Sequence, residues 1–354
     1  MRYFCTYFDR NYLAKGLTLI NSLRKWHDNR ITIYVVCMDE LSRLLLEKLA
    51  IPGVVLVPLH TIEAGDHQLL NTRNDRTAVE YLWTSTPTII LRLLERFSEI
   101  DILTYVDADM FFYASSEPVF QELGAASVLI HEHRFPQHLA HLEQFGRFNV
   151  GLLVFKRDVT SFQVLQWWRE RCLEWCKAAL EDGKYGDQKY LDSWPQLFSG
   201  IVATQNIGVG TAPWNHSQYN FTLKDKRVYV NECPLIINHF HAFHIVNTDI
   251  IVPVAIPDYV NPVSYYATVV PQYVEALDRS IQQIRQVDPE FLFGLTKENH
   301  QFTTETGFIV RNSQLEQIRA IAPSLPFFAV SEEWSLSPGT RTLSDLQTTD
   351  RIGA

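Results

Sequence analysis

Strand-like and helix-like runs alternate over residues 2–113, and this order constrains the fold more than any other feature. The expected strands are short apolar runs at residues 3–8, 31–37, 54–57 and 102–106. The expected helices between them span residues 12–26, 40–49 and 78–97. Helices of this length between strands imply right-handed crossovers. The pattern therefore predicts an α/β fold with a mainly parallel sheet and helices on both faces.

Two aspartates one residue apart follow the fourth of these runs. Asp107 and Asp109 have apolar neighbours on both sides, within residues 103–113. Buried carboxylates need a partner, and a one-residue gap lets both contact a single hard cation. Open α/β sheets bind their ligands at the carboxyl ends of the strands. A strand-end turn with solvated acids is the alternative interpretation, and the apolar flanks favour a metal site.

Composition and charge limit the class of protein. The chain has 354 residues, of which 46% are hydrophobic and 20% charged, so it can bury a large core and is not disordered. A net charge of -9 argues against sequence-independent binding to the phosphates of nucleic acid and, more weakly, against binding to anionic lipid. No apolar run approaches the roughly 20 residues that span a bilayer, and the first residues are too polar for a signal peptide. With five cysteines, an odd number that fits reduced thiols, we expect a cytoplasmic protein, with a peripheral position on the inner face of a membrane left open.

The later part of the chain suggests a second, smaller unit. Strands are expected at residues 126–131, 148–155 and 235–240, a short helix at 136–145 and a long one from 161 to about 180. Prolines in residues 251–262 predict a linker, with helices after it at 265–285 and 313–321. We expect a main domain at 1–250, a helical appendage at 251–330 and a flexible tail at 331–354.

Three histidines lie at the end of the strand expected at residues 235–240. His239, His241 and His244 lie within six positions, and one of them is a candidate third metal ligand. An imidazole beside two carboxylates would favour Mn²⁺ over Mg²⁺.

Three further short motifs have both a structural and a functional interpretation. Asp187 either caps a short helix or points into a cleft together with Gln188. Gly151, two residues after Asn149, either lets a ligand approach the backbone or marks a bulge. Trp214, in a rigid loop, either stacks on a ligand or fills a gap.

In this order, the motifs resemble those of family 8 of the GT-A glycosyltransferases. The set consists of D-x-D at a strand end, N-x-G on a strand, D-Q at a helix start, P-W-N in a loop and H-F-H after a strand. The resemblance covers residues 1 to 245. It implies a Rossmann-like GT-A fold, in which helices flank a mixed sheet. It also implies metal-dependent transfer of a sugar, with retention, from a nucleoside-diphosphate sugar such as a UDP-sugar. The acceptor is left open between a glycan, a lipid-linked molecule and a protein.

The resemblance also implies roles for individual positions. Asp107, Asp109 and His239 would hold Mn²⁺ or Mg²⁺. Asp187 would lie at the hydroxyls of the donor sugar and Gln188 near its anomeric face, and either would be the nucleophile if the reaction were a double displacement. The residues expected to contact the donor are Asp107, Ala108, Asp109, Asn149, Gly151, Arg76 and Trp214.

One part of the family pattern is missing. In the family, the histidine is followed by G-x-x-K-P-W, whose lysine holds the diphosphate. Here Ala242 stands in place of the glycine and Ile245 in place of the lysine. Another cation must then offset the charge of the leaving group, and Lys15, Arg73 and Arg76 are the candidates. The chain therefore resembles a distant branch of the family.

Three other functions are alternatives to sugar transfer. A sugar-nucleotide pyrophosphorylase usually carries a glycine- and lysine-rich loop after its first strand, and residues 7–12 lack one. A haloacid-type phosphatase has Thr two residues after the second Asp, where this chain has Phe111. The non-enzymatic alternative is a sugar-nucleotide-binding protein without turnover, which the missing lysine suggests.

Overall fold

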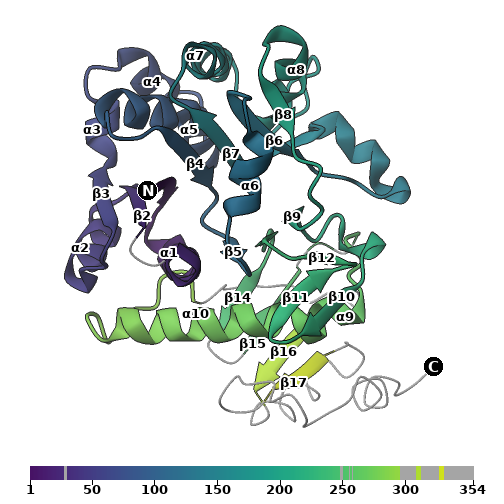
Figure 1. The fold of residues 1–354 in the computed structure, drawn as a ribbon. Helices are drawn as coiled ribbons and strands as arrows, with labels where there is room; N and C mark the ends of the chain where they lie inside the picture. The colour runs from purple at the N-terminus through teal and green to yellow at the C-terminus, as the bar shows by residue number, and fades with distance from the viewer. Residues whose placement is uncertain are drawn as a thin grey trace.

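A seven-stranded mixed sheet forms the centre of the computed structural model, which describes residues 1–27, 30–247, 250–254, 256, 258–295, 308–311 and 327–330 (Figure 1). The strand order is β3-β2-β1-β4-β7-β6-β8. The strands are β1 (Arg2–Phe8), β2 (Ile31–Cys37), β3 (Val54–Pro58), β4 (Ile102–Val106), β6 (Val128–Glu132), β7 (Phe148–Lys156) and β8 (Ile201–Ala203). The predicted α/β class, with helices flanking a mixed sheet, is confirmed.

The sheet is parallel from β3 to β4 and becomes mixed at β7. Strand β7 pairs antiparallel with both β4 and β6, and β8 pairs parallel with β6. The chain runs outward from β1 through β2 to β3 and then returns to the other side of β1 as β4. The order of the strands thus reverses between β1 and β4, and ligands of open α/β sheets bind at such a point.

Apolar side chains cover both faces of the sheet because successive residues of a strand point to opposite sides. Phe4 of β1 and Ile33 of β2 belong to one core cluster, and the next residues, Cys5 and Tyr34, belong to the other. Helices α1 (Leu13–His27) and α2 (Glu40–Leu49) contribute to the first cluster. Helices α5 (Ala78–Arg96) and α7 (Val159–Glu174) pack against each other and contribute to the second.

Shorter elements connect these parts. The helices are α3 (Leu59–Glu63), α4 (His67–Thr72), α6 (Glu117–Leu123) and α8 (Trp194–Leu197). The 3₁₀ helices are η1 (Arg10–Tyr12), η2 (Gln137–Phe145), η3 (Gln188–Ser193) and η4 (His216–Gln218). The short helix predicted at 136–145 is thus the 3₁₀ helix η2.

A small sheet lies beyond the carboxyl ends of the central strands. Its strands, in spatial order, are β5 (Met110–Phe112), β13 (Ile237–His239) and β9 (Val209–Thr211). Strand β13 is antiparallel to β5 and parallel to β9. A separate three-stranded sheet contains β10 (Phe221–Lys224), β11 (Arg227–Val230) and β12 (Cys233–Pro234).

The long helix predicted from residue 161 to about 180 is wrong at its end, because α7 stops at Glu174. Trp175 is extended, and its carbonyl accepts a hydrogen bond from the Tyr190 hydroxyl at 2.7 Å. The amide of Ala178 donates to Glu80 at 2.8 Å. Distant side chains thus bind backbone groups that a longer helix would have paired internally. Cys172 lies on the helix and Cys176 beyond it, and both are buried.

The region after residue 250 contains strands as well as helices. Helices α9 (Val263–Thr268) and α10 (Val270–Arg285) are present, and α10 packs along α1 in the same core as the central sheet (Figure 1). A four-stranded sheet contains β14 (His244–Asn247), β15 (Ile250–Val252), β16 (Phe308–Arg311) and β17 (Phe327–Val330).

Four expectations for this region have different outcomes. The linker predicted at 251–262 is wrong at its start, where β15 pairs with β14 and β16. The helix predicted at 313–321 and the tail at 331–354 lie outside the described residues. The division of the chain at residue 250 stays a prediction.

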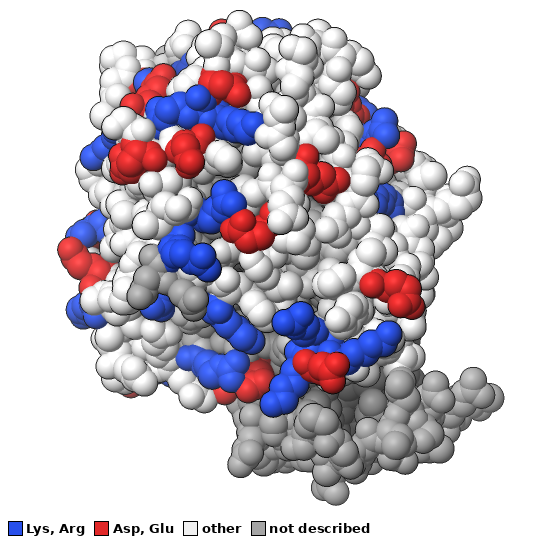
Figure 2. Space-filling view, viewed as in Figure 1, with Lys and Arg blue, Asp and Glu red and all other residues white. Residues whose placement is uncertain are grey.

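Within the described part of the chain, no helix combines the length and the apolar character needed to cross a membrane. Basic and acidic side chains lie beside one another across the face shown in Figure 2.

Candidate active site

A pocket of about 730 Å³ opens at the carboxyl ends of β1 and β4, where the strand order reverses. Residues that directly follow the two strands line it, among them Asp9 after β1 and Asp107 after β4. Segments distant in sequence complete its walls. Of the residues predicted from sequence, the pocket brings together Asp107, Ala108, Asp109, Asn149, Asp187, Gln188, Trp214 and His239.

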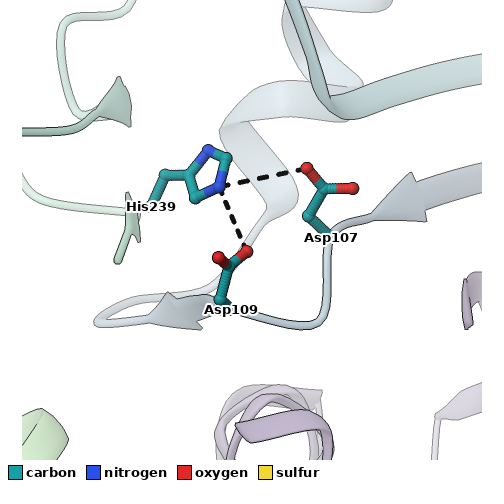
Figure 3. Close-up of side chains that lie close together, drawn as sticks. All are labelled: Asp107, Asp109 and His239. Atoms are coloured by element: carbon teal, nitrogen blue, oxygen red, sulfur yellow. Dashed lines mark ion pairs between the residues drawn. The ribbon is translucent and has the colours of Figure 1, made fainter. Parts of the chain in front are cut away.

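Asp107, Asp109 and His239 converge at this pocket (Figure 3). The Nε2 atom of His239 lies 3.1 Å from Oδ1 of Asp109 and 3.9 Å from Oδ2 of Asp107. The pairing of β13 with β5 sets this approach, because His239 stands opposite Met110. The amide of Phe240 also donates to the Asp109 carbonyl at 2.9 Å, which holds the two segments in register.

Neighbouring groups fix the orientation of Asp107. The Tyr105 hydroxyl donates to Oδ1 of Asp107 at 2.6 Å, and the amide of Asp107 donates to the Gly151 carbonyl at 2.9 Å. These bonds leave Oδ2 of Asp107 directed at His239, as Figure 3 shows. A carboxylate held in this way needs little rearrangement to bind a ligand.

The three side chains shift one another's pKa values. Burial raises the pKa of Asp109, but the His239 imidazolium outweighs burial and holds that pKa well below its usual range. Burial together with the charge of Asp109 raises the pKa of Asp107, against the opposing effect of His239. Burial lowers the pKa of His239, and the two carboxylates more than reverse this, so its pKa is raised. The pKa values of Asp107, Asp109 and His239 thus depend on one another, and a positively charged neighbour stabilises the two carboxylates.

The donor set fits a divalent cation. One ligand atom from each of Asp107, Asp109 and His239 lies within 4.8 Å of the others, and His239 is buried. Two carboxylates and an imidazole suit Mn²⁺ or Mg²⁺, and a three-residue set leaves coordination positions for a substrate and water.

Asp187 is buried in the pocket wall, with 6% of its surface exposed. Asp187 occupies the N-cap position of η3, but its side chain makes no capping hydrogen bond there. Burial, with a smaller effect from Asp107, raises the pKa of Asp187 to about 7. Gln188 follows it in the wall, and its Nε2 donates to the Phe145 carbonyl at 3.1 Å.

Gly151 lies behind the pocket wall and close to the Asp107 carboxylate. A Cβ at this position would lie 2.4 Å from Cε of Met110 and 3.1 Å from Oδ2 of Asp107. The amide of Gly151 donates to Oδ1 of Asn149 at 2.9 Å, and Nδ2 of Asn149 is 3.1 Å from Nε2 of His133. The glycine therefore lets β7 pass close to Asp107, and Asn149 reaches the pocket surface.

Trp214 supports the histidines. Its Nε1 donates to the His133 carbonyl at 3.0 Å, and the indole is 4% exposed. Its ring centroid lies 5.3 Å from that of His239 and 5.4 Å from that of His241, in edge-to-face contact with both. The indole thus fills the space behind the imidazoles while one part of it lines the pocket.

The three candidate cations have different surroundings. Arg73 pairs with Glu63, and Arg76 pairs with Asp75. The structure does not bring Arg76 to the pocket: it lines a separate surface hollow of about 460 Å³ beside α4 and α7. Lys15 contacts the loop that follows His239, where its Nζ donates to the Phe243 carbonyl at 2.8 Å.

Several pocket residues were not predicted from the sequence. Asn11 and Tyr12 follow β1, and their place after a central parallel strand is a signal that could have identified them. Trp83 of α5, Phe145 of η2 and Tyr185 form an aromatic wall, with the Phe145 and Tyr185 ring centroids 4.8 Å apart. No local pattern marked these three, because they come from three separate segments.

Two curated proteins of Bacillus subtilis (strain 168) are similar to the chain over most of its length. The uncharacterized protein YfnF is 33% identical over 306 residues, which cover 84% of this chain and 99% of YfnF. The chain belongs to the family of YfnF. The uncharacterized protein YfnD is 32% identical over 247 residues, which cover 69% of this chain and 78% of YfnD. No protein-family model matches the chain.

Solved structures show a more distant likeness. The galactosyltransferase LgtC, in complex with donor and acceptor sugar analogs, aligns with a TM-score of 0.48 and 17% identity, covering 78% of this chain and 95% of LgtC. The glycosyltransferase GlyE of Streptococcus pneumoniae TIGR4 aligns with a TM-score of 0.40 and 14% identity, covering 93% of this chain and 74% of GlyE.

Proposed function

We propose that the protein is a metal-dependent glycosyltransferase that takes a sugar from a nucleoside-diphosphate sugar, with UDP as the nucleotide. One observation carries the proposal: Asp107, Asp109 and His239 converge on the same pocket that Asp187 and Gln188 line. Cation ligands thus stand beside a buried carboxyl group, and sugar transfer from a diphosphate can use both. The order of the sequence motifs, which resembles family 8 of the GT-A enzymes, supports the same function.

The metal ligands would act on the leaving group. Mn²⁺ or Mg²⁺ held by Asp107, Asp109 and His239 would supply counter-charge to the diphosphate. The imidazole ligand makes Mn²⁺ the preferred ion of the two. Tyr105 keeps Asp107 oriented, and Trp214 packs against His239, so the ligand set is organised before any donor binds.

Asp187 and Gln188 would act on the sugar. As the sugar leaves, its anomeric carbon gains positive charge, and an ionised Asp187 in a buried wall would stabilise that charge. We propose retention of configuration. Front-face attack achieves retention without a protein nucleophile, whereas double displacement requires one, and Asp187 would be that nucleophile.

The test is a panel of UDP-sugars with Mn²⁺, read out as release of UDP. We expect release with at least one donor, and we expect Asp109→Ala to abolish it while circular dichroism and cooperative unfolding are retained. Asp225→Ala, at an exposed turn between β10 and β11, is the matched control and should keep full activity. Full activity of Asp109→Ala would contradict the metal role.

A second candidate function is sugar-nucleotide binding without turnover. The observation in its favour is that the described residues lining the pocket include no Lys or Arg. Tight binding of UDP with Mn²⁺, without UDP release for any donor and acceptor supplied, would favour this alternative.

A further inference from the structure

The pocket has an excess of negative charge. Among the described residues that line it are four aspartates, Asp9, Asp107, Asp109 and Asp187, and no Lys or Arg. A divalent ion bound by Asp107 and Asp109 would neutralise those two carboxylates and no more. The negative charge of a donor diphosphate would then be left without a partner, and buried charge without a partner is costly.

The position of the missing family lysine cannot supply the charge. Ile245 occupies it, is 5% exposed and belongs to the apolar core, where its backbone pairs with Ile251. The preceding loop keeps an unusual conformation, because Ala242 has a φ of 57°, in the left-handed region that favours glycine. The loop after His239 therefore has a backbone suited to a glycine, but position 245 points into the core.

Lys15 reaches the same loop from another element. It lies near the start of α1, and its Nζ donates to the Phe243 carbonyl at 2.8 Å. The same atom lies 4.6 Å from the ring centroid of Tyr12, a residue that lines the pocket. The ammonium is thus held between the wall that follows β1 and the loop that follows β13.

Of the three candidate cations, Lys15 is the one whose side-chain nitrogen contacts the loop after His239. Arg73 and Arg76 pair with Glu63 and Asp75 instead.

We propose that Lys15 supplies the positive charge that holds the donor diphosphate, in place of the lysine that Ile245 replaces. The inference rests on the proposed function. Lys15 does not itself line the pocket, but it is one helix turn from the residues after β1 and contacts the loop after the candidate metal ligand His239. In this proposal, the diphosphate of a metal-bound donor lies beside this ammonium. Hydrogen bonds between an ammonium and a phosphate are charge-assisted and strong.

The role of Lys15 is tested by measuring the affinities for UDP and for uridine by titration calorimetry, at a fixed, saturating Mn²⁺ concentration. Lys15→Gln keeps a donor for the Phe243 carbonyl but removes the charge, and Lys15→Arg keeps the charge. We expect Lys15→Gln to weaken UDP binding about tenfold or more, with uridine binding and Mn²⁺ binding not weakened. Lys15→Arg should retain most of the UDP affinity. Lys25→Gln, on the last turn of the same helix, is the matched control and should bind as the wild type does.

Several outcomes would overturn the inference. One is that Lys15→Gln binds UDP as tightly as the wild type does. Another is that Lys15→Gln loses UDP binding and uridine binding equally, which a merely structural role of Lys15 predicts. If Lys15→Gln does not fold, Lys15→Met provides the same comparison. If the wild type binds no UDP in the presence of Mn²⁺, the proposed function itself fails, and that result is distinct from a failure of the Lys15 role alone.

Discussion

The Nε2 atom of His239 lies 3.1 Å from Oδ1 of Asp109, although the two residues are far apart in the chain. The pairing of β13 with β5 produces this contact, since His239 stands opposite Met110, the residue after Asp109. The small sheet β5-β13-β9 is therefore part of the candidate metal site. The carboxylates come from the turn between β4 and the edge strand β5, and the imidazole comes from the central strand β13.

We expect His239→Gln to weaken the binding of Mn²⁺ at least about tenfold, because one of three protein ligands is lost while the two carboxylates remain. Titration calorimetry with Mn²⁺ and no nucleotide measures this directly. His67→Gln, which changes an exposed histidine at the start of α4, is the control and should leave the affinity unchanged. An unaltered affinity of His239→Gln would remove His239 from the site.

Mn²⁺ and UDP should stabilise the protein more together than the sum of their separate effects. A ligand at 100 times its dissociation constant adds about 2.7 kcal/mol to the free energy of unfolding. If the metal ion contacts the diphosphate, each ligand strengthens the binding of the other. Thermal unfolding with each ligand alone, with both and with both plus EDTA measures the coupling. An equal rise in Tm from UDP with and without EDTA would count against it.

We expect Gly151→Ala to lower the free energy of unfolding by about 1–3 kcal/mol and to weaken Mn²⁺ binding. The new methyl group would lie 2.4 Å from Cε of Met110 and 3.1 Å from Oδ2 of Asp107, so a neighbour must move. Urea unfolding and Mn²⁺ titration measure the two effects.

Gly65→Ala is the control for this change, because the glycine has a φ of 75° and no heavy atom within 4 Å of the added Cβ. It should cost about 1–2 kcal/mol of stability through backbone strain and leave Mn²⁺ binding unchanged. If Gly151→Ala binds Mn²⁺ as the wild type does, the close packing of β7 does not position Asp107.

The stability of the metal-free protein should depend on pH through Asp187. Burial raises the pKa of Asp187 to about 7 in the folded state, against an ordinary value of 3.8. Between these values the folded protein keeps a proton that the unfolded chain has released. The contribution of Asp187 to stability therefore falls as the pH rises, by at most about 1.4 kcal/mol per pH unit.

Asp187→Asn removes this dependence. We expect the variant to gain stability relative to the wild type as the pH rises from 4 to 7, and the difference to become constant above about pH 8. Urea unfolding of both proteins at pH 5 and pH 8, with EDTA present, measures the difference. A difference that is the same at both pH values would show that Asp187 is not protonated in the folded protein near neutral pH.

Local sequence patterns were sufficient to predict most central elements. The apolar run of β2 and the capping box of α5, in which Thr77 and Glu80 bond each other's backbone, act over a few residues. The paired aspartates marked the end of β4 for the same reason. The apolar strand and the acidic residues that follow it are neighbours in the sequence, so the change from apolar to charged residues is visible locally.

Contacts between distant segments decided what the sequence had left open. The sequence offered three histidines near residue 240, and the register of β13 on β5 selects His239. It offered Lys15 and two arginines as cations, and only the folded chain shows Lys15 against the loop after His239. The elements themselves follow from short-range periodicity and capping, which the order of residues determines. The identity of the groups that meet in the pocket follows from strand pairing and helix packing between remote parts of the chain, and tertiary structure alone sets that.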